Sequence, residues 1–67
     1  MKLKELLNHT QDFIAVRVEE CGKLVAEKTP RILIENLSAD RLGQTVGLIN
    51  GAGENKIRVS IIPQKAN

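Results

Sequence analysis

The stretch FIAVRVEECGKLVAEKT, residues 13–29, carries the clearest structural signal in the chain. From residue 13 to residue 19 apolar side chains alternate with polar or small ones, as in a half-buried β-strand. Gly22 follows, well placed for the positive φ that a short hairpin loop requires. Residues 23–29 return as a second strand, with Leu24 and Ala26 on one face. We therefore predict a β-hairpin here, around which the other elements pack.

Ahead of the hairpin, residues 2–9 have the spacing of an amphipathic helix. Leu3, Leu6 and Leu7 stand at i, i+3 and i+4, which places them on one stripe. Two helical turns are not stable alone in water, so we expect this stripe to dock on the sheet.

After the hairpin, Pro30 cannot donate to a strand ladder and marks an edge, a bulge or a strand end. The apolar run at residues 32–34 is too short for periodicity to decide its type, and we favour a strand that continues past Pro30. For residues 37–42 we predict a single helical turn, with Ser38 as its N-cap and Gly43 as its stop.

The stretch GLINGAGENK, residues 47–56, invites comparison with a phosphate-binding loop. A dinucleotide fingerprint requires a third glycine, but that position is Lys56, and the following residues alternate like a strand instead of opening a helix. Asn50-Gly51 between alternating apolar residues favours a hairpin. We predict strands at residues 44–50 and 56–62, with Val46 and Leu48 facing the helix.

The predicted fold class is α+β, with the N-terminal helix packed on a small antiparallel sheet of two hairpins. The element order is helix, strand, strand, short helical turn, strand, strand. We expect one domain over residues 1–67, with residues 64–67 as a frayed tail.

Size and composition limit the function classes. A chain of 67 residues buries only roughly 60 % of its unfolded surface, so a partner or a second copy is the expected supplement to its stability. One cysteine, Cys21, and one histidine, His9, form neither an internal disulfide nor a Cys/His zinc site. The sequence has no signal-peptide core and no membrane span, so we expect a cytoplasmic protein.

Catalytic chemistry is not indicated by any motif. Cys21 lies in a predicted turn and His9 at a helix end, with no orienting third group for nucleophilic catalysis. No carboxylate lies in an apolar run that would raise its pKa for acid–base work. We predict no catalytic residue, cofactor, metal or small-molecule substrate.

Aliphatic side chains exceed what one helix on one sheet face can cover. We expect an exposed patch that contacts a protein partner or a second copy, unless the twist of the sheet hides it. The candidate contact residues are Val25, Ile32, Ile34, Ile49 and Ile62.

Basic side chains at outward strand positions suggest a second surface. Arg17 and Arg58 at such positions, with Lys56 nearby, are candidate contacts for a polyanion. RNA-binding sheets display aromatic side chains for stacking, however, and Phe13 is the only aromatic residue. Nucleic acid is therefore the less favoured partner.

In layout, the segments MKLKELL, FIAVRVEECGKLV, ENLSADRL and VGLINGAGENKIRVSI resemble small uncharacterised proteins of phages and mobile elements of Gram-positive bacteria. The chain departs from that pattern at TPRILI, where a shorter connection is expected. The resemblance implies an accessory protein that blocks or modulates a host factor. Our hypothesis is a non-enzymatic binding protein acting by protein–protein contact, and the alternative is a nucleic-acid-binding module.

Overall fold

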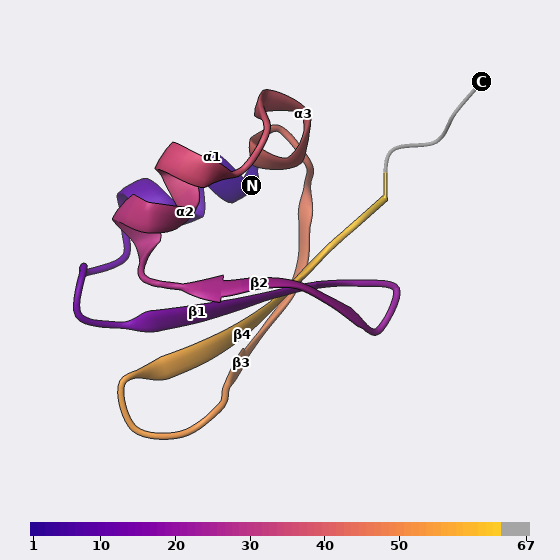
Figure 1. The fold of residues 1–67 in the computed structure, drawn as a ribbon. Coiled ribbons are helices and arrows are strands. Elements are labelled where there is room, and N and C mark those ends of the chain that lie inside the picture. The colour runs from indigo at the N-terminus through magenta and orange to yellow at the C-terminus, as the bar shows by residue number, and fades with distance from the viewer. Residues whose placement is uncertain (64–67) are drawn as a thin grey trace.

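The structure is a computed structural model, and it describes residues 1–63; the predicted tail at residues 64–67 lies outside the described residues. Three helices lie on one side of a four-stranded sheet, which confirms the α+β class with an N-terminal helix (Figure 1). The elements in chain order are α1 (Leu3–Asn8), β1 (Ala15–Glu20), β2 (Lys23–Lys28), α2 (Pro30–Asn36), α3 (Ala39–Leu42), β3 (Val46–Gly51) and β4 (Lys56–Ile61).

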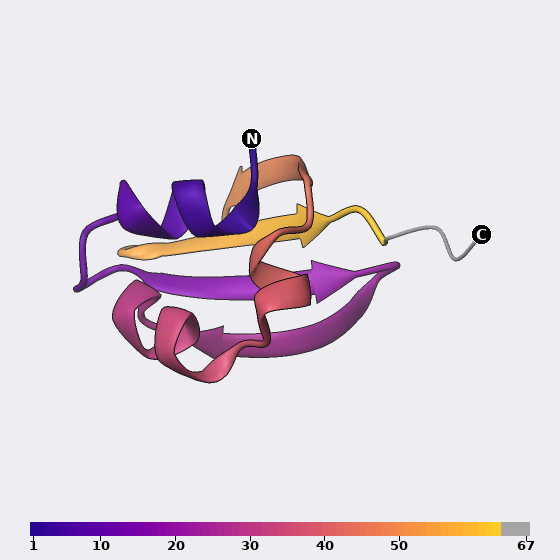
Figure 2. The ribbon, with the colours of Figure 1, turned by 90° about the horizontal axis from the view of Figure 1, so that it is seen from above.

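The sheet is mixed and not purely antiparallel as predicted. Its strand order is β2-β1-β4-β3, and the two hairpins meet through β1 and β4, which run parallel. The connection through α2 and α3 carries the chain across the sheet face before β3 begins (Figure 2). The last strand then returns beside the first, which local hairpin patterns do not predict.

The core lies between the helices and the covered face of the sheet. Its fully buried hydrophobic side chains come from α1, α2, β1 and β4; they are Leu3, Leu7, Leu33, Val16, Val18, Val59 and Ile61. Figure 2 shows α1 and α2 side by side above the strands. The expected docking of the leucine stripe of α1 is confirmed at Leu3 and Leu7, which are buried, and Leu6 is half-buried against them.

Residues 30–36 form helix α2, so the predicted strand is wrong. Pro30 occupies the first helical turn, where its missing N–H would have no partner in any case. Leu33 is buried beneath the helix while Ile32 is 41 % exposed. A run of three apolar residues has no periodicity of its own, and burial of one of them against α1 and the sheet decides the type.

The short helical turn is confirmed as α3. The Ser38 Oγ accepts a hydrogen bond of 3.2 Å from the backbone N–H of Arg41, as expected of an N-cap. Gly43 follows the helix as its C-cap.

Both hairpins are confirmed, with one difference in the second turn. Positive φ occurs at Cys21 and Gly22 in the first turn, and at Gly53 and Asn55 in the second. Gly51 still belongs to β3, so the chain reverses over residues 52–55 and not at Asn50-Gly51.

The β3 strand contains a bulge that reverses part of the predicted inward face. The register jumps from Val46 opposite Ile61 to Leu48 opposite Ser60, leaving Gly47 as the extra residue. Leu48 therefore points away from the helices, contrary to the prediction, and Val46 and Ile49 share the covered side. The β1–β2 pair has a similar shift at Val25, which places Leu24 opposite Glu19. Leu24 and Ala26 therefore lie on opposite faces, and the prediction that they share one face is wrong.

Candidate interaction surface

The side of the sheet opposite the helices is not covered by any element of residues 1–63, and we call it the open sheet face (Figure 1). Strand register assigns its side chains, because directly paired residues share a face. Its charged part comprises Arg17, Glu19, Glu27, Lys56 and Arg58. Its apolar part comprises Leu24, Leu48 and Ile62.

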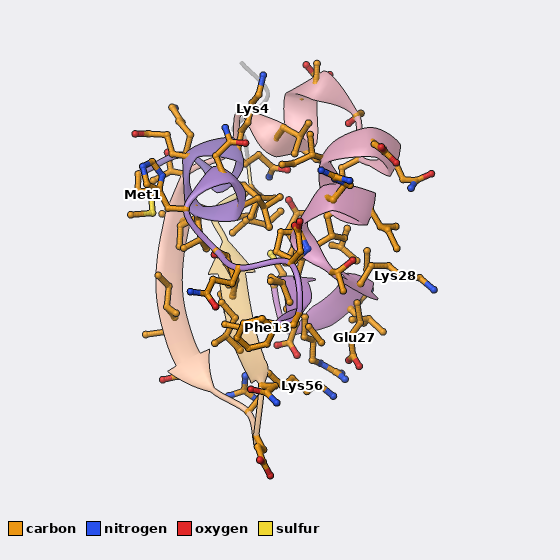
Figure 3. All side chains as sticks on the ribbon, turned by 90° about the vertical axis from the view of Figure 1, so that its left-hand side faces the viewer. Met1, Lys4, Phe13, Glu27, Lys28 and Lys56 are labelled. Carbon is orange, nitrogen blue, oxygen red and sulfur yellow. The ribbon has the colours of Figure 1, made fainter. Side chains whose placement is uncertain are left out.

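The charged part is a connected set of ion pairs across β2, β1 and β4. The Arg17 Nε lies 2.6 Å from Glu19 Oε2, and its Nη1 lies 3.2 Å from Glu27 Oε1. The Lys56 Nζ lies 2.9 Å from Glu27 Oε2. Figure 3 shows the Glu27 and Lys56 side chains close together at the end of the sheet nearest the viewer. Arg17 and Lys56 thus both have carboxylate partners within the chain.

These contacts shift the protonation equilibria of two members. The hydrogen bond and charge of Lys56, with a smaller contribution from Arg17, hold the pKa of Glu27 below its ordinary value. The hydrogen bond to Glu19, with a smaller contribution from Glu27, raises the pKa of Arg17. Both shifts favour the charged forms, so the network keeps its ion pairs at neutral pH.

Arg58 is the exception in the charged part. Its Nε lies 4.0 Å from Glu19 Oε1, and its side chain is 50 % exposed. Glu19 is already bonded to Arg17 at 2.6 Å. Three cations against two carboxylates leave the face with a net charge of +1, concentrated at Arg58.

The three predicted polyanion contacts, Arg17, Arg58 and Lys56, are brought to one sheet face. Their carboxylate partners, Glu19 and Glu27, were not predicted. Arg17 opposite Glu27 is a cross-strand pair, visible only once the β1–β2 register is known.

The apolar part consists of three side chains that are each about half exposed. Leu24, Leu48 and Ile62 are 53 %, 55 % and 52 % exposed. Ile62 lies over Gly47, where its Cγ1 would be 3.1 Å from an added Cβ. Because the bulge also turns Leu48 to this side, Leu48 and Ile62 lie at the same end of the face, on neighbouring strands.

The five predicted partner contacts occupy different parts of the molecule. Val25 and Ile34 are half-buried and pack against the core. Ile32 is exposed on α2, and Ile49 is exposed on the helix-covered side of edge strand β3. Only Ile62 lies on the open sheet face.

Leu24 and Leu48 were not predicted as partner contacts. A glycine inside a strand pattern, such as Gly47, is a signal for a bulge and would have identified Leu48. The outward position of Leu24 depends on the register shift at Val25, and the sequence contains no comparable signal for that shift.

The residues considered for nucleophilic chemistry lie apart. Cys21 is exposed in the β1–β2 turn, and His9 caps α1, with its Nδ1 2.8 Å from the Glu5 carbonyl oxygen. The β1–β2 turn and the connection from α1 to β1 are at opposite ends of the sheet (Figure 1). Within residues 1–63, no three His, Cys, Asp or Glu side chains gather where a metal ion could bind.

A second polar cluster lies on the helix side of the sheet. The Arg41 Nη1 is 3.2 Å from Glu20 Oε1, and the Gln44 Nε2 donates to Glu20 Oε2 at 2.6 Å. The hydrogen bond from Gln44, with a smaller contribution from Arg41, holds the pKa of Glu20 below its ordinary value. This cluster ties α3 to the end of β1 and has a structural role.

In the described part of the chain, no helix combines the length and the apolar character needed to cross a membrane. Comparison with family models, with curated proteins and with solved structures finds no match to this chain.

Proposed function

We propose that the protein is a non-enzymatic binding protein that acts by protein–protein contact through the open sheet face. The observation that supports this proposal is the exposure of Leu24, Leu48 and Ile62 on a sheet face that no helix of residues 1–63 covers. Exposed apolar side chains beside ordered polar groups are typical of protein contact surfaces. An accessory protein that modulates a host factor, as the family resemblance implies, would act through such a surface.

A nucleic-acid-binding module is the rival proposal. The shared face of Arg17, Lys56 and Arg58 favours it, but Glu19 and Glu27 offset two of the three charges. Binding driven by phosphates needs several free cations. A gel-shift titration with single-stranded and duplex oligonucleotides separates the two proposals: retention at low salt that fades at high salt would support nucleic acid.

The proposed contact surface is tested by affinity capture with matched variants. Leu48→Ser alters the open sheet face, whereas Ile32→Ser removes a comparably exposed side chain from α2 on the opposite side. We expect Leu48→Ser to lose the captured proteins and Ile32→Ser to retain them. Equal capture by the wild type and both variants would contradict a role for this face.

A further inference from the structure

We infer that the open sheet face binds a protein segment that presents a carboxylate to Arg58 and aliphatic side chains to Leu48 and Ile62. This inference rests on the proposed function and adds the chemistry of the partner. It follows from the charge that remains on the face after its internal ion pairs are formed.

Arg58 is the cation on this face that residues 1–63 leave least satisfied. Arg17 has two carboxylate contacts, at 2.6 and 3.2 Å, and Lys56 has one at 2.9 Å. The nearest carboxylate to Arg58 is Glu19 at 4.0 Å, the outer limit for an ion pair. The planar guanidinium therefore keeps donors available for a carboxylate supplied by a partner, which it can bind in a bidentate manner.

The residues directly beside Arg58 are polar or charged, and Arg17 lies opposite it on β1. Asn50 lies directly opposite it on β3. Along the same face of β4, Ser60 and Ile62 follow at two-residue spacing, and Leu48 lies opposite Ser60. A partner segment whose carboxylate binds Arg58 would thus place its aliphatic side chains further along the face, over Leu48 and Ile62.

A second copy of the chain fits this face less well. Both carboxylates of the face are already engaged by Arg17 and Lys56, so a facing copy would bring a second net positive charge and no free anion. Like charges brought together across an interface are unfavourable. The charge on the face therefore selects an acidic partner over self-association.

Nucleic acid also fits less well than an acidic protein. A single incompletely paired cation provides little counterion release, and the aliphatic residues beside it offer no aromatic ring for base stacking. A protein segment with a carboxylate and aliphatic side chains matches both the charged part and the apolar part of the open sheet face.

The inference is tested by selecting binders from a display library of short random linear peptides at physiological salt. We expect the recovered peptides to share an Asp or Glu close to Leu, Ile or Val. Their affinity should fall roughly tenfold for Arg58→Gln, as for one lost charge-assisted contact. Arg31→Gln is the matched control, because Arg31 is an exposed arginine on α2, on the helix side.

A charge exchange keeps the test decisive if Arg58→Gln perturbs the fold. Peptides in which the selected acidic residue is replaced by Lys should bind Arg58→Glu better than the wild type. Thermal unfolding followed by circular dichroism establishes that each variant is folded.

The remaining outcomes separate this inference from the proposed function. Peptides that lose affinity for Leu48→Ser but not for Arg58→Gln would overturn the carboxylate inference and leave the contact surface standing. Peptides unaffected by either substitution, or no recovered peptides, would overturn both. Selection of basic peptides would overturn the carboxylate inference.

Discussion

At the scale of single residues, Gln44 joins three parts of the fold. It is the one polar side chain of residues 1–63 that is buried, at 5 % exposure. Its Nε2 donates to Glu20 Oε2 at 2.6 Å and to the Ile62 carbonyl oxygen at 3.1 Å. The backbone carbonyl oxygen of Gln44 accepts a hydrogen bond of 2.9 Å from the backbone N–H of Leu3. Gln44 thus joins the ends of β1 and β4 to the start of α1.

We predict that Gln44→Met destabilises the protein although Met fills a similar volume. The buried amide donor is lost, and the free energy of unfolding should fall by on the order of 1 kcal/mol. Urea unfolding measures this, with the exposed Gln11→Met as the control. An unchanged unfolding midpoint for Gln44→Met would show that these bonds add no net stability.

The pH dependence of stability follows from Glu27. Because Lys56 and Arg17 lower its pKa in the folded state, its stabilising contribution is present above the ordinary, unfolded pKa of about 4.5. That contribution is lost as the pH falls through the lower folded value. We predict that the stability difference between the wild type and Glu27→Gln shrinks as the pH is lowered from 7 through this range.

Urea unfolding at a series of pH values checks the prediction, and Glu35→Gln on α2 is a suitable control. Glu35 is exposed and makes no ion pair within residues 1–63. A gap between wild type and Glu27→Gln that is constant with pH would contradict the lowered pKa.

At the scale of secondary-structure elements, helix α2 buries Leu33 and exposes the preceding residue, Ile32. We predict that Leu33→Ala lowers the free energy of unfolding by about 2–5 kcal/mol, because it opens a cavity in the core. Ile32→Ala should cost less than about 1 kcal/mol, because Ile32 is 41 % exposed. Chemical denaturation of both variants measures the contrast, and equal losses would argue against the helix.

The second hairpin turn has one glycine that the backbone requires and one that it does not. Gly53 has φ of +125°, which side chains rarely adopt, while Gly51 lies in β3 with no atom within 4 Å of an added Cβ. We predict that Gly53→Ala costs about 1–3 kcal/mol of stability. Gly51→Ala should be neutral or stabilise by up to about 1 kcal/mol. Thermal unfolding of the two variants decides, and the reverse order would contradict the turn geometry.

At the scale of the whole molecule, a single covered sheet face encloses a core of seven buried hydrophobic side chains. Such a small core supplies limited stability, so a bound partner would raise the unfolding temperature by mass action. The second sheet face remains available for that partner.

We predict that the isolated protein is a monomer of 7.4 kDa at micromolar concentration, because facing copies would oppose like charges. Size-exclusion chromatography with light scattering measures the mass. A dimer that dissociates on Leu48→Ser would show instead that the open sheet face binds a second copy.

The elements that depend on local chemistry follow from the amino-acid sequence alone. The stripe of Leu3 and Leu7, the two alternating hairpins and the Ser38 cap are each set by residues a few positions apart. Arg17 and Arg58 were also predicted at outward positions, because strand alternation is a local property.

The pairing of distant segments depends instead on tertiary packing. The parallel contact of β1 with β4, the helical state of residues 30–36 and the bulge at Gly47 depend on which surfaces are buried together. The parallel pairing brings Lys56 and Arg58 beside Glu27 and Glu19, and the register shifts at Val25 and Gly47 turn Leu24 and Leu48 to the open sheet face. The candidate surface could not be predicted in full, because burial and cross-strand ion pairing act between residues that are far apart in the chain.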